Sequence, residues 1–452
     1  MKTQTNSGVF DARTLGRPKM LILGFQHMFA MFGATILVPA LTGLSVSATL
    51  LFAGLGTLLF HLLTQMKVPA FLGSSFAFIG GYAAVVAIGA EHGLDQAASL
   101  PYACIGVFFA GLIYLILAAL IKIFGVKKVM RFFPPIVTGP IIIAIGLTLS
   151  GSAIANCSAN WWIALLAIAI IIVCNIWGKG MIKIIPILLG VIGSYIVAAC
   201  FGLVDFQRVA DAAWVGLPFQ MEDTAFHVFK NPNWGLIVTA IITIIPISLA
   251  TMVEHIGDMC AISSTTGKNY LEDPGLHRTL MGDGLATALA SLFGAPANTT
   301  YGENTGVLNL TRIYDPRVIR IAAFLAILSS FCPKFTALIG VMPVATIGGV
   351  SLVLYGMIAA VGVRNIVENQ VDFTASRNVI IAALILVLAI GINYGPGAIA
   401  FQIGATKISL SGLAVAALVG ILLNAFLPGK DYEFGTNPKG DVSVDFEINR
   451  VK

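Results

Sequence analysis

Charged side chains are scarce in this sequence. Asp, Glu, Lys and Arg together make up 10% of the 452 residues, whereas hydrophobic residues make up 58% and the mean hydropathy is +0.92. Soluble globular proteins carry about 25% charged residues, and a large soluble protein cannot hide this much apolar surface. These values exclude a soluble protein and indicate a membrane protein. A long polar stretch is also missing, so we expect no separate soluble domain.

Signals for cleavage, catalysis and metal binding are missing as well. Residues 1–19 are polar and lack the basic-then-apolar pattern of a cleaved signal peptide, so we expect the apolar run from Met20 to remain as a span. No HExxH motif and no nucleophile elbow occurs, which argues against a membrane hydrolase. We therefore expect neither an enzyme nor a cofactor. The cysteines stand singly, without metal-ligand spacing, and are expected to be apolar packing residues: Cys104, Cys157, Cys174, Cys200, Cys260 and Cys332.

Apolar runs between polar breaks predict an all-α protein with about 14 membrane spans. The runs lie near residues 20–41, 47–65, 69–91, 101–124, 134–154, 160–178, 182–203, 234–262, 279–294, 297–314, 317–338, 341–363, 378–395 and 410–427. With a cytoplasmic N-terminus, the loops between these spans alternate between the two sides and place 22 of the 26 Lys and Arg residues inside. The four exceptions are Arg208, Lys230, Lys334 and Lys407. This asymmetry predicts a multi-pass protein of the inner cell membrane with both termini cytoplasmic.

Fourteen spans divide into two groups of seven, and an odd number of spans inverts the second group. The predicted first repeat covers residues 20–203 and the second covers 234–427, joined by an outer loop at 204–233 and followed by a cytoplasmic tail at 428–452. Their third spans resemble each other, since "VPAFLGSSFAFIGG" and "APANTTYGENTGV" both place Pro in a stretch of small residues. Interrupted segments at matching positions of two halves indicate a transporter site near the membrane midplane.

Ionisable residues inside the predicted spans mark candidate functional positions. A carboxylate at the bilayer centre costs at least about 2.5–3.5 kcal/mol on insertion scales, so each one is a functional hypothesis. Glu254 and Asp258 are four residues apart and share one helical face, and Glu303 lies inside the interrupted second segment. A buried carboxylate held by a neighbouring helix is the alternative for Glu254 and Glu303. For Asp258, the alternative to a functional role is a structural one, as the partner of another residue.

Three further ionisable residues, His27, Asp283 and His255, lie inside the predicted spans. His27 is a candidate for proton coupling or a hydrogen-bonded core histidine, and Asp283 is either functional or a residue that caps or packs against a neighbouring backbone. His255 points about 100° away from Glu254 around the helix, so we expect it to be structural. The same divergence argues against a metal site built from Glu254, His255 and Asp258, and we expect no metal.

Carboxylates that face a small, dehydrated cavity bind ligands rich in N–H donors. Backbone N–H groups of the two interrupted segments would donate to the carbonyl groups of the same ligand. A flat ring with alternating N–H and C=O groups satisfies both requirements, and Phe76 offers an aromatic face or edge to such a ring. The chemistry favours an imide- or amide-bearing heterocycle over an inorganic anion or a sugar.

Five stretches of this chain resemble the nucleobase–ascorbate transporter family. They are "QHMFAMFGATILVP" (26–39), "PAFLGSSFAF" (69–78), "EHIGD" (254–258), "DPGLHRTLMGDGL" (273–285) and "NTTYGENTGVLNLTR" (298–312). They occur in the family's order, cover the chain from about residue 20 to 427, and look most like the bacterial uracil-carrying branch.

The resemblance implies a core domain made of segments 1–4 and 8–11 and a gate domain made of segments 5–7 and 12–14. Segments 3 and 10 would each begin as a short strand before turning helical. Glu254 and Glu303 would hydrogen-bond a pyrimidine, while the backbone amides of Phe76 and Gly302 would bind its carbonyl groups. Tyr355 matches an aromatic residue on the gate side.

Substrate and coupling ion follow from two further positions. Purine and xanthine carriers of the family tend to have Gln where Glu303 stands, so the resemblance implies uracil as the substrate. Asp258 stands where the uracil carriers have His, in the part of the site that couples to protons. We therefore expect proton symport by alternating access, with Asp258, His27 and Glu254 in the coupling, and Tyr301 included in the substrate site.

Several alternatives stay open at this point. The substrate could be xanthine, urate or another base; the coupling ion could be Na⁺; and an anion exchanger or channel of the same inverted architecture is a remote possibility. The expected partners are the substrate, H⁺ and membrane lipid, without nucleic acid, and the family resemblance suggests a homodimer.

Overall fold

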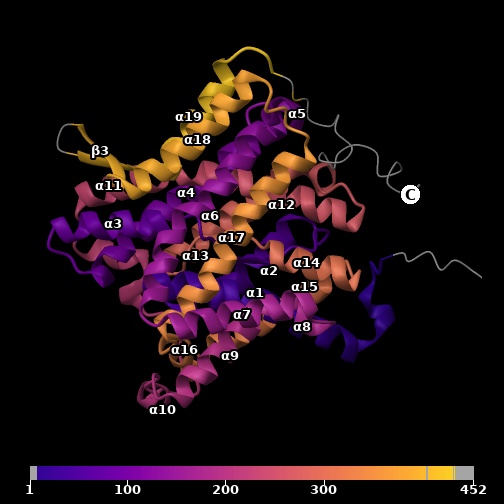
Figure 1. Ribbon diagram of the computed structural model, residues 1–452, viewed down its shortest axis with the longest axis vertical. Helices are drawn as coiled ribbons and strands as arrows, with labels where there is room; N and C mark the ends of the chain where they lie inside the picture. Colours follow the sequence, from indigo (N-terminus) through magenta and orange to yellow (C-terminus); the bar gives the residue numbers. More distant parts are fainter. Residues whose placement is uncertain (1–7, 404–405, 431, 433–452) are drawn as a thin grey trace, which may run out of the picture.

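The computed structural model describes residues 8–403, 406–430 and 432, and it is mostly helical (Figure 1). The first half contains, in order, α1 (Arg17–Thr42), α2 (Val46–Leu63), β1 (Leu72–Ser74), α3 (Ile79–Glu91), α4 (Gln96–Phe124), α5 (Val126–Met130), α6 (Pro135–Ser158), α7 (Trp161–Trp177), α8 (Met181–Ile184) and α9 (Pro186–Cys200). The predicted cytoplasmic tail lies mostly outside the described residues.

The second half begins after a long connection that contains the short helix α10 (Gln207–Asp211). It continues with α11 (Trp234–Ile244), α12 (Ile247–Thr266), α13 (Leu276–Leu292), β2 (Asn298–Thr300), α14 (Gly302–Thr311), α15 (Pro316–Ser330), α16 (Pro333–Gly340), α17 (Val344–Glu368), α18 (Ser376–Tyr394), β3 (Ala398–Ile403), β4 (Thr406–Ser411) and α19 (Gly412–Phe426).

Many of these helices are long and apolar enough to cross a membrane. Seven of the described segments meet that criterion, or eight if the bent pair α15–α16 counts as one span. Four more helices are apolar but shorter: Ile79–Glu91, Trp161–Ile176, Pro186–Cys200 and Gly412–Phe426. The expected polytopic helical fold is confirmed, and the count of 14 segments remains a prediction.

Proline interrupts two of the predicted spans. The run predicted at 234–262 is divided at Pro246 into α11 and α12, because proline has no N–H to donate and its ring collides with the preceding turn. The run predicted at 317–338 ends at Ser330 and resumes at Pro333 after a bend of 86°. The antiparallel hairpin of β3 and β4 was not predicted.

The two interrupted segments meet as neighbouring strands. β1 pairs with β2 in antiparallel orientation, with Leu72 opposite Thr300 and Ser74 opposite Asn298. Each strand is followed by a helix, α3 or α14, as predicted for the third and tenth segments. The pairing gives the N–H and C=O groups of the extended backbone hydrogen-bond partners inside the protein. Irregular backbone at membrane depth is tolerated only where such partners, or a water-filled cavity, are present.

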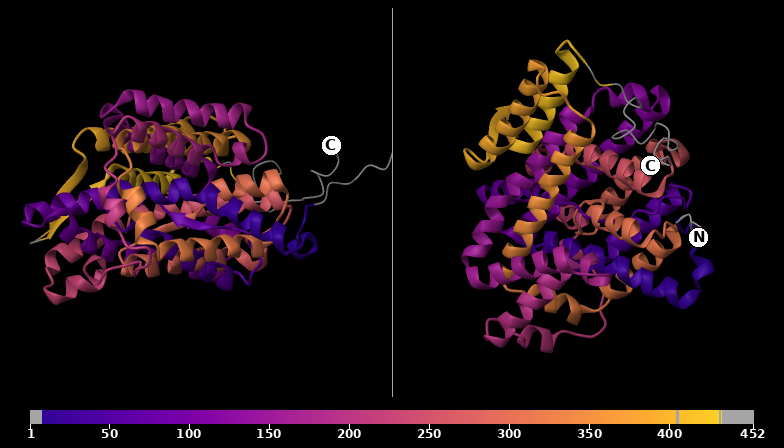
Figure 2. Two further views of the ribbon diagram at one scale, coloured as in Figure 1. Left: turned by 90° about the horizontal axis from the view of Figure 1, so that it is seen from below. Right: turned by 45° about the vertical axis from the view of Figure 1, so that its right-hand side comes forward.

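The ends of the elements gather at two opposite sides of the molecule. In Figure 1, α3, α11, β3 and α16 lie toward the left, whereas α5, α8 and α14 lie toward the right. The right-hand view of Figure 2 brings the second side forward, where α1 begins. Segments 3 and 10 therefore run in opposite directions away from the strand pair, α3 toward the left and α14 toward the right.

Small residues allow close helix contacts, as is usual in membrane proteins. α6 and α17 have the most extensive contact in the structure. A methyl group added at Gly362 of α17 would lie 2.6 Å from the carbonyl oxygen of Gly139 in α6. This distance is shorter than any normal carbon–oxygen contact, so glycine is required where the two helices cross.

We predict that Gly362→Ala destabilises the protein by about 1–3 kcal/mol, the usual cost of overpacking a tight contact. A melting curve of the purified protein in detergent measures the effect as a lower Tm. Gly391→Ala in α18 is the matched control, because a methyl group there meets no atom within 4 Å. An unchanged Tm for Gly362→Ala would contradict the packing described for α6 and α17.

Candidate functional site

Two threonines hold the strand pair in position, each with its hydroxyl beside both the N–H and the carbonyl oxygen of one strand residue. On α2, the Thr57 hydroxyl accepts from the N–H of Leu72 at 2.9 Å and lies 3.3 Å from its carbonyl oxygen. On α13, the Thr287 hydroxyl accepts from the N–H of Asn298 at 3.2 Å and donates to its carbonyl oxygen at 2.9 Å. α2 and α13 are the second segments of the two predicted repeats, so the recurrence agrees with an internal two-fold relation.

A tyrosine links the end of β2 to β1. The Tyr301 hydroxyl donates to the carbonyl oxygen of Ser74 at 3.0 Å and lies 3.1 Å from the Ser74 hydroxyl. It also lies 3.3 Å from the hydroxyl of Thr35 on α1. The tyrosine, expected as a substrate contact, therefore directs its hydroxyl into the protein and braces the strands.

Three of the predicted carboxylates surround the point where β2 becomes α14. Glu254 and Asp258 lie one turn apart on α12, and Glu303 lies in the first turn of α14. Glu254 interacts electrostatically with Glu303 and Asp283, and Asp258 interacts with all three. Glu254, Asp258 and Glu303 are each partly exposed, and no ion pair neutralises any of them within the described part of the chain.

Two backbone donors that follow the paired strands are unused. Within the described residues, neither the N–H of Phe76, after β1, nor the N–H of Gly302, at the start of α14, donates a hydrogen bond. The free N–H groups at the start of α14 also stabilise negative charge at Glu303 or on a ligand. The site thus combines acceptors on side chains with donors on the backbone.

Local open space lies beside one glycine on α12 and another on α14, and we take it as one candidate opening. Gly257 and Gly306 border it, since a methyl group at either position would meet no atom within 4 Å. Further along, Ser264 on α12 and Asn309 on α14 are exposed. Both helices run from the level of the strand pair toward the side of the molecule where α1 begins.

Other residues near the carboxylates are buried. Phe76 and Tyr355 meet edge to face with their ring centres 5.8 Å apart, and both side chains are buried. On α12, Thr251 and Val253, which precede Glu254, are buried as well.

His255 and Asp283 form a buried pair behind the site. The His255 Nδ1 lies 2.7 Å from the Thr300 hydroxyl and 3.1 Å from an oxygen of Asp283, and both side chains are 0% exposed. His255 was expected to be structural, and this contact with β2 agrees. Asp283 faces the histidine side chain instead of capping or packing against a neighbouring backbone.

His27 lies on α1 next to the first turns of α14. The Asn304 side-chain amide donates to the carbonyl oxygen of His27 at 3.1 Å and contacts its Nδ1 at 3.2 Å. Asn304 was not named as a site residue, although it follows Glu303 directly in the quoted "ENTG" motif. Thr57 and Thr287 were missed too, because isolated threonines in apolar helices give no sequence signal.

The described residues contain no group of three His, Cys, Asp or Glu side chains that could hold a metal ion. The His255 side chain is directed to Thr300 and Asp283, and no contact of His255 with Glu254 or Asp258 is among its hydrogen bonds and ion pairs in the described part of the chain. The three side chains of the "EHIGD" motif therefore do not converge.

Comparison with known proteins places these features in a family. Residues 18–398 match the xanthine–uracil permease model, which is described as a permease family. A uracil permease of Bacillus caldolyticus is 41% identical over 429 residues, covering 93% of this chain and 94% of the relative. Uracil permeases of Bacillus subtilis, at 40% identity, and Escherichia coli, at 36%, cover 94% and 89% of this chain and 96% and 90% of their own.

Solved structures of proteins with much lower sequence identity share the fold. The transmembrane domain of a cyanobacterial bicarbonate transporter, BicA, matches with a TM-score of 0.60 at 15% identity, over 93% of this chain and 99% of that one. The murine anion transporter Slc26a9 matches with a TM-score of 0.59 at 11% identity, over 94% and 73%. At these identities the likeness concerns the fold alone.

We predict that Gly306→Cys reacts with a charged, water-soluble thiol reagent much faster than Val307→Cys. Both residues belong to α14, but Gly306 borders the open space and Val307 is 1% exposed. The rates are measured by mass spectrometry in a background whose six native cysteines are replaced by serine. Equal rates at the two positions would contradict an aqueous opening along this face of α14.

Proposed function

We propose that this chain, a multi-pass membrane transporter that belongs to the nucleobase–ascorbate transporter family, imports uracil together with a proton. It is a carrier rather than an enzyme, as the permeases related to it are. The observation that supports the proposal best is that Glu254 and Glu303 interact electrostatically and lack ion-pair partners among the described residues, while the N–H groups of Phe76 and Gly302 donate no hydrogen bond there. The relatives named above support uracil within the nucleobases.

Uracil is complementary to this arrangement of donors and acceptors. Its ring carries N–H groups for the carboxylates of Glu254 and Glu303 and carbonyl groups for the N–H groups of Phe76 and Gly302. Hydrogen bonds with one ionised partner are worth roughly 1.5–3 kcal/mol each. A site that binds N–H groups in this way rejects a ring that lacks them, because the carboxylates would then be desolvated without partners.

Aromatic residues complete the proposed site. Phe76 and Tyr355 meet edge to face, and in the proposed site a flat ring packs against this aromatic surface. Tyr301 contributes through the backbone it supports, since its hydroxyl is bonded to Ser74. Tyr355 is on α17, so the proposed core carries the hydrogen-bonding groups and the proposed gate supplies a covering ring.

Proton coupling is assigned to Asp258, Glu254 and His27. Asp258 and Glu254 repel each other when both are charged, and neither has a basic partner among the described side chains. Adding a proton removes one charge from a site that must move through a dry barrier, which favours the loaded transporter over the empty, charged one. His27 is linked to α14 through Asn304 and is placed to respond to charge near Glu303.

Transport then proceeds by alternating access. In the proposed orientation both termini face the cytoplasm, so the opening along α12 and α14 is the inward one. The core, made of segments 1–4 and 8–11, would move against the gate to expose the same residues to the outside. A homodimer in the inner membrane is the proposed assembly.

The alternatives differ in substrate or ion. Xanthine, urate or another base would use the same donors and acceptors, and Na⁺ could replace the proton at oxygen ligands such as Asp258 and Glu254. The structural relatives BicA and Slc26a9 transport anions, but three unpaired carboxylates at the present site repel an anionic substrate.

We predict that Glu303→Gln weakens uracil binding about ten- to a hundred-fold, because a neutral amide replaces a charged acceptor. Isothermal titration with uracil and with xanthine measures the affinity and any shift in preference. Glu222→Gln, in the outer loop, is the control and should bind uracil as the native protein does. If Glu303→Gln keeps native uracil affinity, its carboxylate is not a substrate contact.

We predict that Asp258→Asn keeps uracil exchange across a membrane but loses accumulation driven by a pH gradient. Asn has the shape of Asp but cannot take up and release a proton in the cycle. Both activities are measured with radiolabelled uracil in proteoliposomes, with the exposed loop variant Asp211→Asn as control. Gradient-driven accumulation by Asp258→Asn at the native level would remove Asp258 from the coupling.

A further inference from the structure

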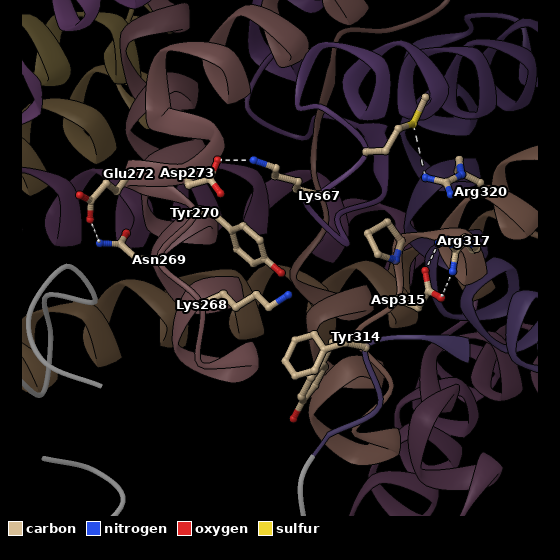
Figure 3. A pocket seen from close by; sticks show the side chains of 13 residues that line it. Lys67, Lys268, Asn269, Tyr270, Glu272, Asp273, Tyr314, Asp315, Arg317 and Arg320 are labelled. Carbon is tan, nitrogen blue, oxygen red and sulfur yellow. Dashed lines mark hydrogen bonds and ion pairs between the residues drawn. The ribbon is translucent and has the colours of Figure 1, made fainter. Parts of the chain in front are cut away.

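A second, charged cleft lies at the side of the molecule where α1 begins. Its volume is about 710 Å³, within the range of about 300–1,000 Å³ that is usual for ligand pockets. It includes none of the carboxylates proposed to bind uracil. It is lined by Phe10, Met66, Lys67, Lys268, Asn269, Tyr270, Glu272, Asp273, Tyr314, Asp315, Pro316, Arg317 and Arg320 (Figure 3).

The segment before α1 forms one fixed wall of this cleft. The N–H of Val9 donates to the carbonyl oxygen of Arg312, and the N–H of Tyr314 donates to the carbonyl oxygen of Val9, both at 2.8 Å. The N–H of Ala12 donates to a carboxylate oxygen of Asp315 at 2.7 Å. The ring of Phe10 lies 5.3 Å from the ring of Tyr314. These contacts hold the wall in place without a ligand.

Two of the three carboxylates that line the cleft are neutralised by neighbouring cations. Asp273 pairs with Lys67 from the turn after α2. Asp315 pairs with Arg317 at 3.1 Å, and Arg317 also pairs with Asp11 at 2.9 Å. A hydrogen bond from the Arg13 side chain holds the pKa of Asp11 at about 2, so Asp11 stays charged at neutral pH.

Lys268 and Arg320 remain without a carboxylate partner among the described side chains. The Lys268 ammonium lies over the Phe10 ring, 4.1 Å from its centre, and an Arg320 nitrogen contacts the weak acceptor sulfur of Met66 at 3.4 Å. Asp315 attracts Arg320 electrostatically but does not form an ion pair with it. Figure 3 shows Lys268 and Arg320 on opposite walls and Glu272 turned toward Asn269. Two cations therefore face the cleft without an ion pair, and the third lining carboxylate, Glu272, contacts Asn269 and neither of them.

We propose that this cleft binds an organic phosphate. An arginine fork and a lysine point charge on facing walls fit the several oxygens of a phosphate group. The volume exceeds what inorganic phosphate needs, and Phe10 and Tyr314 supply aromatic surface for an attached organic group. A soluble phosphate monoester, such as a nucleoside monophosphate, and the headgroup of an anionic phospholipid share this chemistry.

The position of the cleft connects it to the transport helices. Lys268 follows α12, which carries Glu254 and Asp258, and Arg320 lies on α15, which follows α14 with Glu303. A phosphate that bridges the two cations would tie the ends of both helices together. Binding at the cleft does not require that uracil be the substrate.

The test is titration of the purified protein, in detergent free of phospholipid, with uridine monophosphate, uridine and inorganic phosphate. We expect uridine monophosphate to bind at millimolar concentration or below and uridine not to bind. Lys268→Gln and Arg320→Gln should each weaken binding about tenfold or more, the effect of losing one charge-assisted contact. Arg364→Gln, which changes an exposed arginine paired with Glu368 on α17, should have no effect.

A second arm identifies the source of the phosphate. Native mass spectrometry of protein extracted from membranes shows whether phosphatidylglycerol is retained, and its loss in K268Q/R320Q would support the cleft with a lipid headgroup as occupant. The proposal is overturned if neither uridine monophosphate nor phosphatidylglycerol binds. It is also overturned if the double variant binds these two compounds as the native protein does. Melting curves of the same samples check folding. Titrations with uracil test the proposed substrate independently, so that a failure of the uracil proposal can be told apart from a failure of the phosphate proposal.

Discussion

The antiparallel pairing of β1 with β2 is the constraint on which the rest of this structure depends. Extended backbone inside a membrane must find partners within the protein, because no water is available to hydrogen-bond it. The strands satisfy each other over three residue pairs, and Thr57 and Thr287 bond the Leu72 and Asn298 positions from α2 and α13. The N–H groups of Phe76 and Gly302, two residues beyond the strand ends, donate no hydrogen bond within the described residues, and these are the proposed donors of the candidate site.

The same constraint explains how charge is tolerated at membrane depth. Glu254, Asp258 and Glu303 are partly exposed. Asp283 has no exposure and is placed beside His255 instead. A carboxylate in a membrane protein thus needs either an aqueous opening or a hydrogen-bonding partner, and this protein uses both solutions within a few residues of β2.

The helical fold, the interrupted segments and the carboxylates could be predicted from the sequence, because they rest on local composition. Apolar runs of span length, Pro and Gly within the third and tenth runs, and acidic residues inside spans are each visible without knowing what they contact. The partners could not be predicted. That His255 pairs with Asp283, that Asn304 bonds His27, and that Tyr301 turns its hydroxyl to Ser74 are consequences of how distant segments pack. The β3–β4 hairpin and the α15–α16 bend also depend on tertiary contacts.

The central claim is that the protein transports a neutral base together with a proton. The proposed binding site is formed by the β1–β2 strand pair and the carboxylate cluster. The claim is tested most directly by uptake of radiolabelled uracil into proteoliposomes of the native protein, with an alkaline interior and no Na⁺. The account predicts accumulation above the external concentration that disappears when a protonophore dissipates the gradient. Accumulation that requires Na⁺, or no uracil uptake under either gradient, would contradict it.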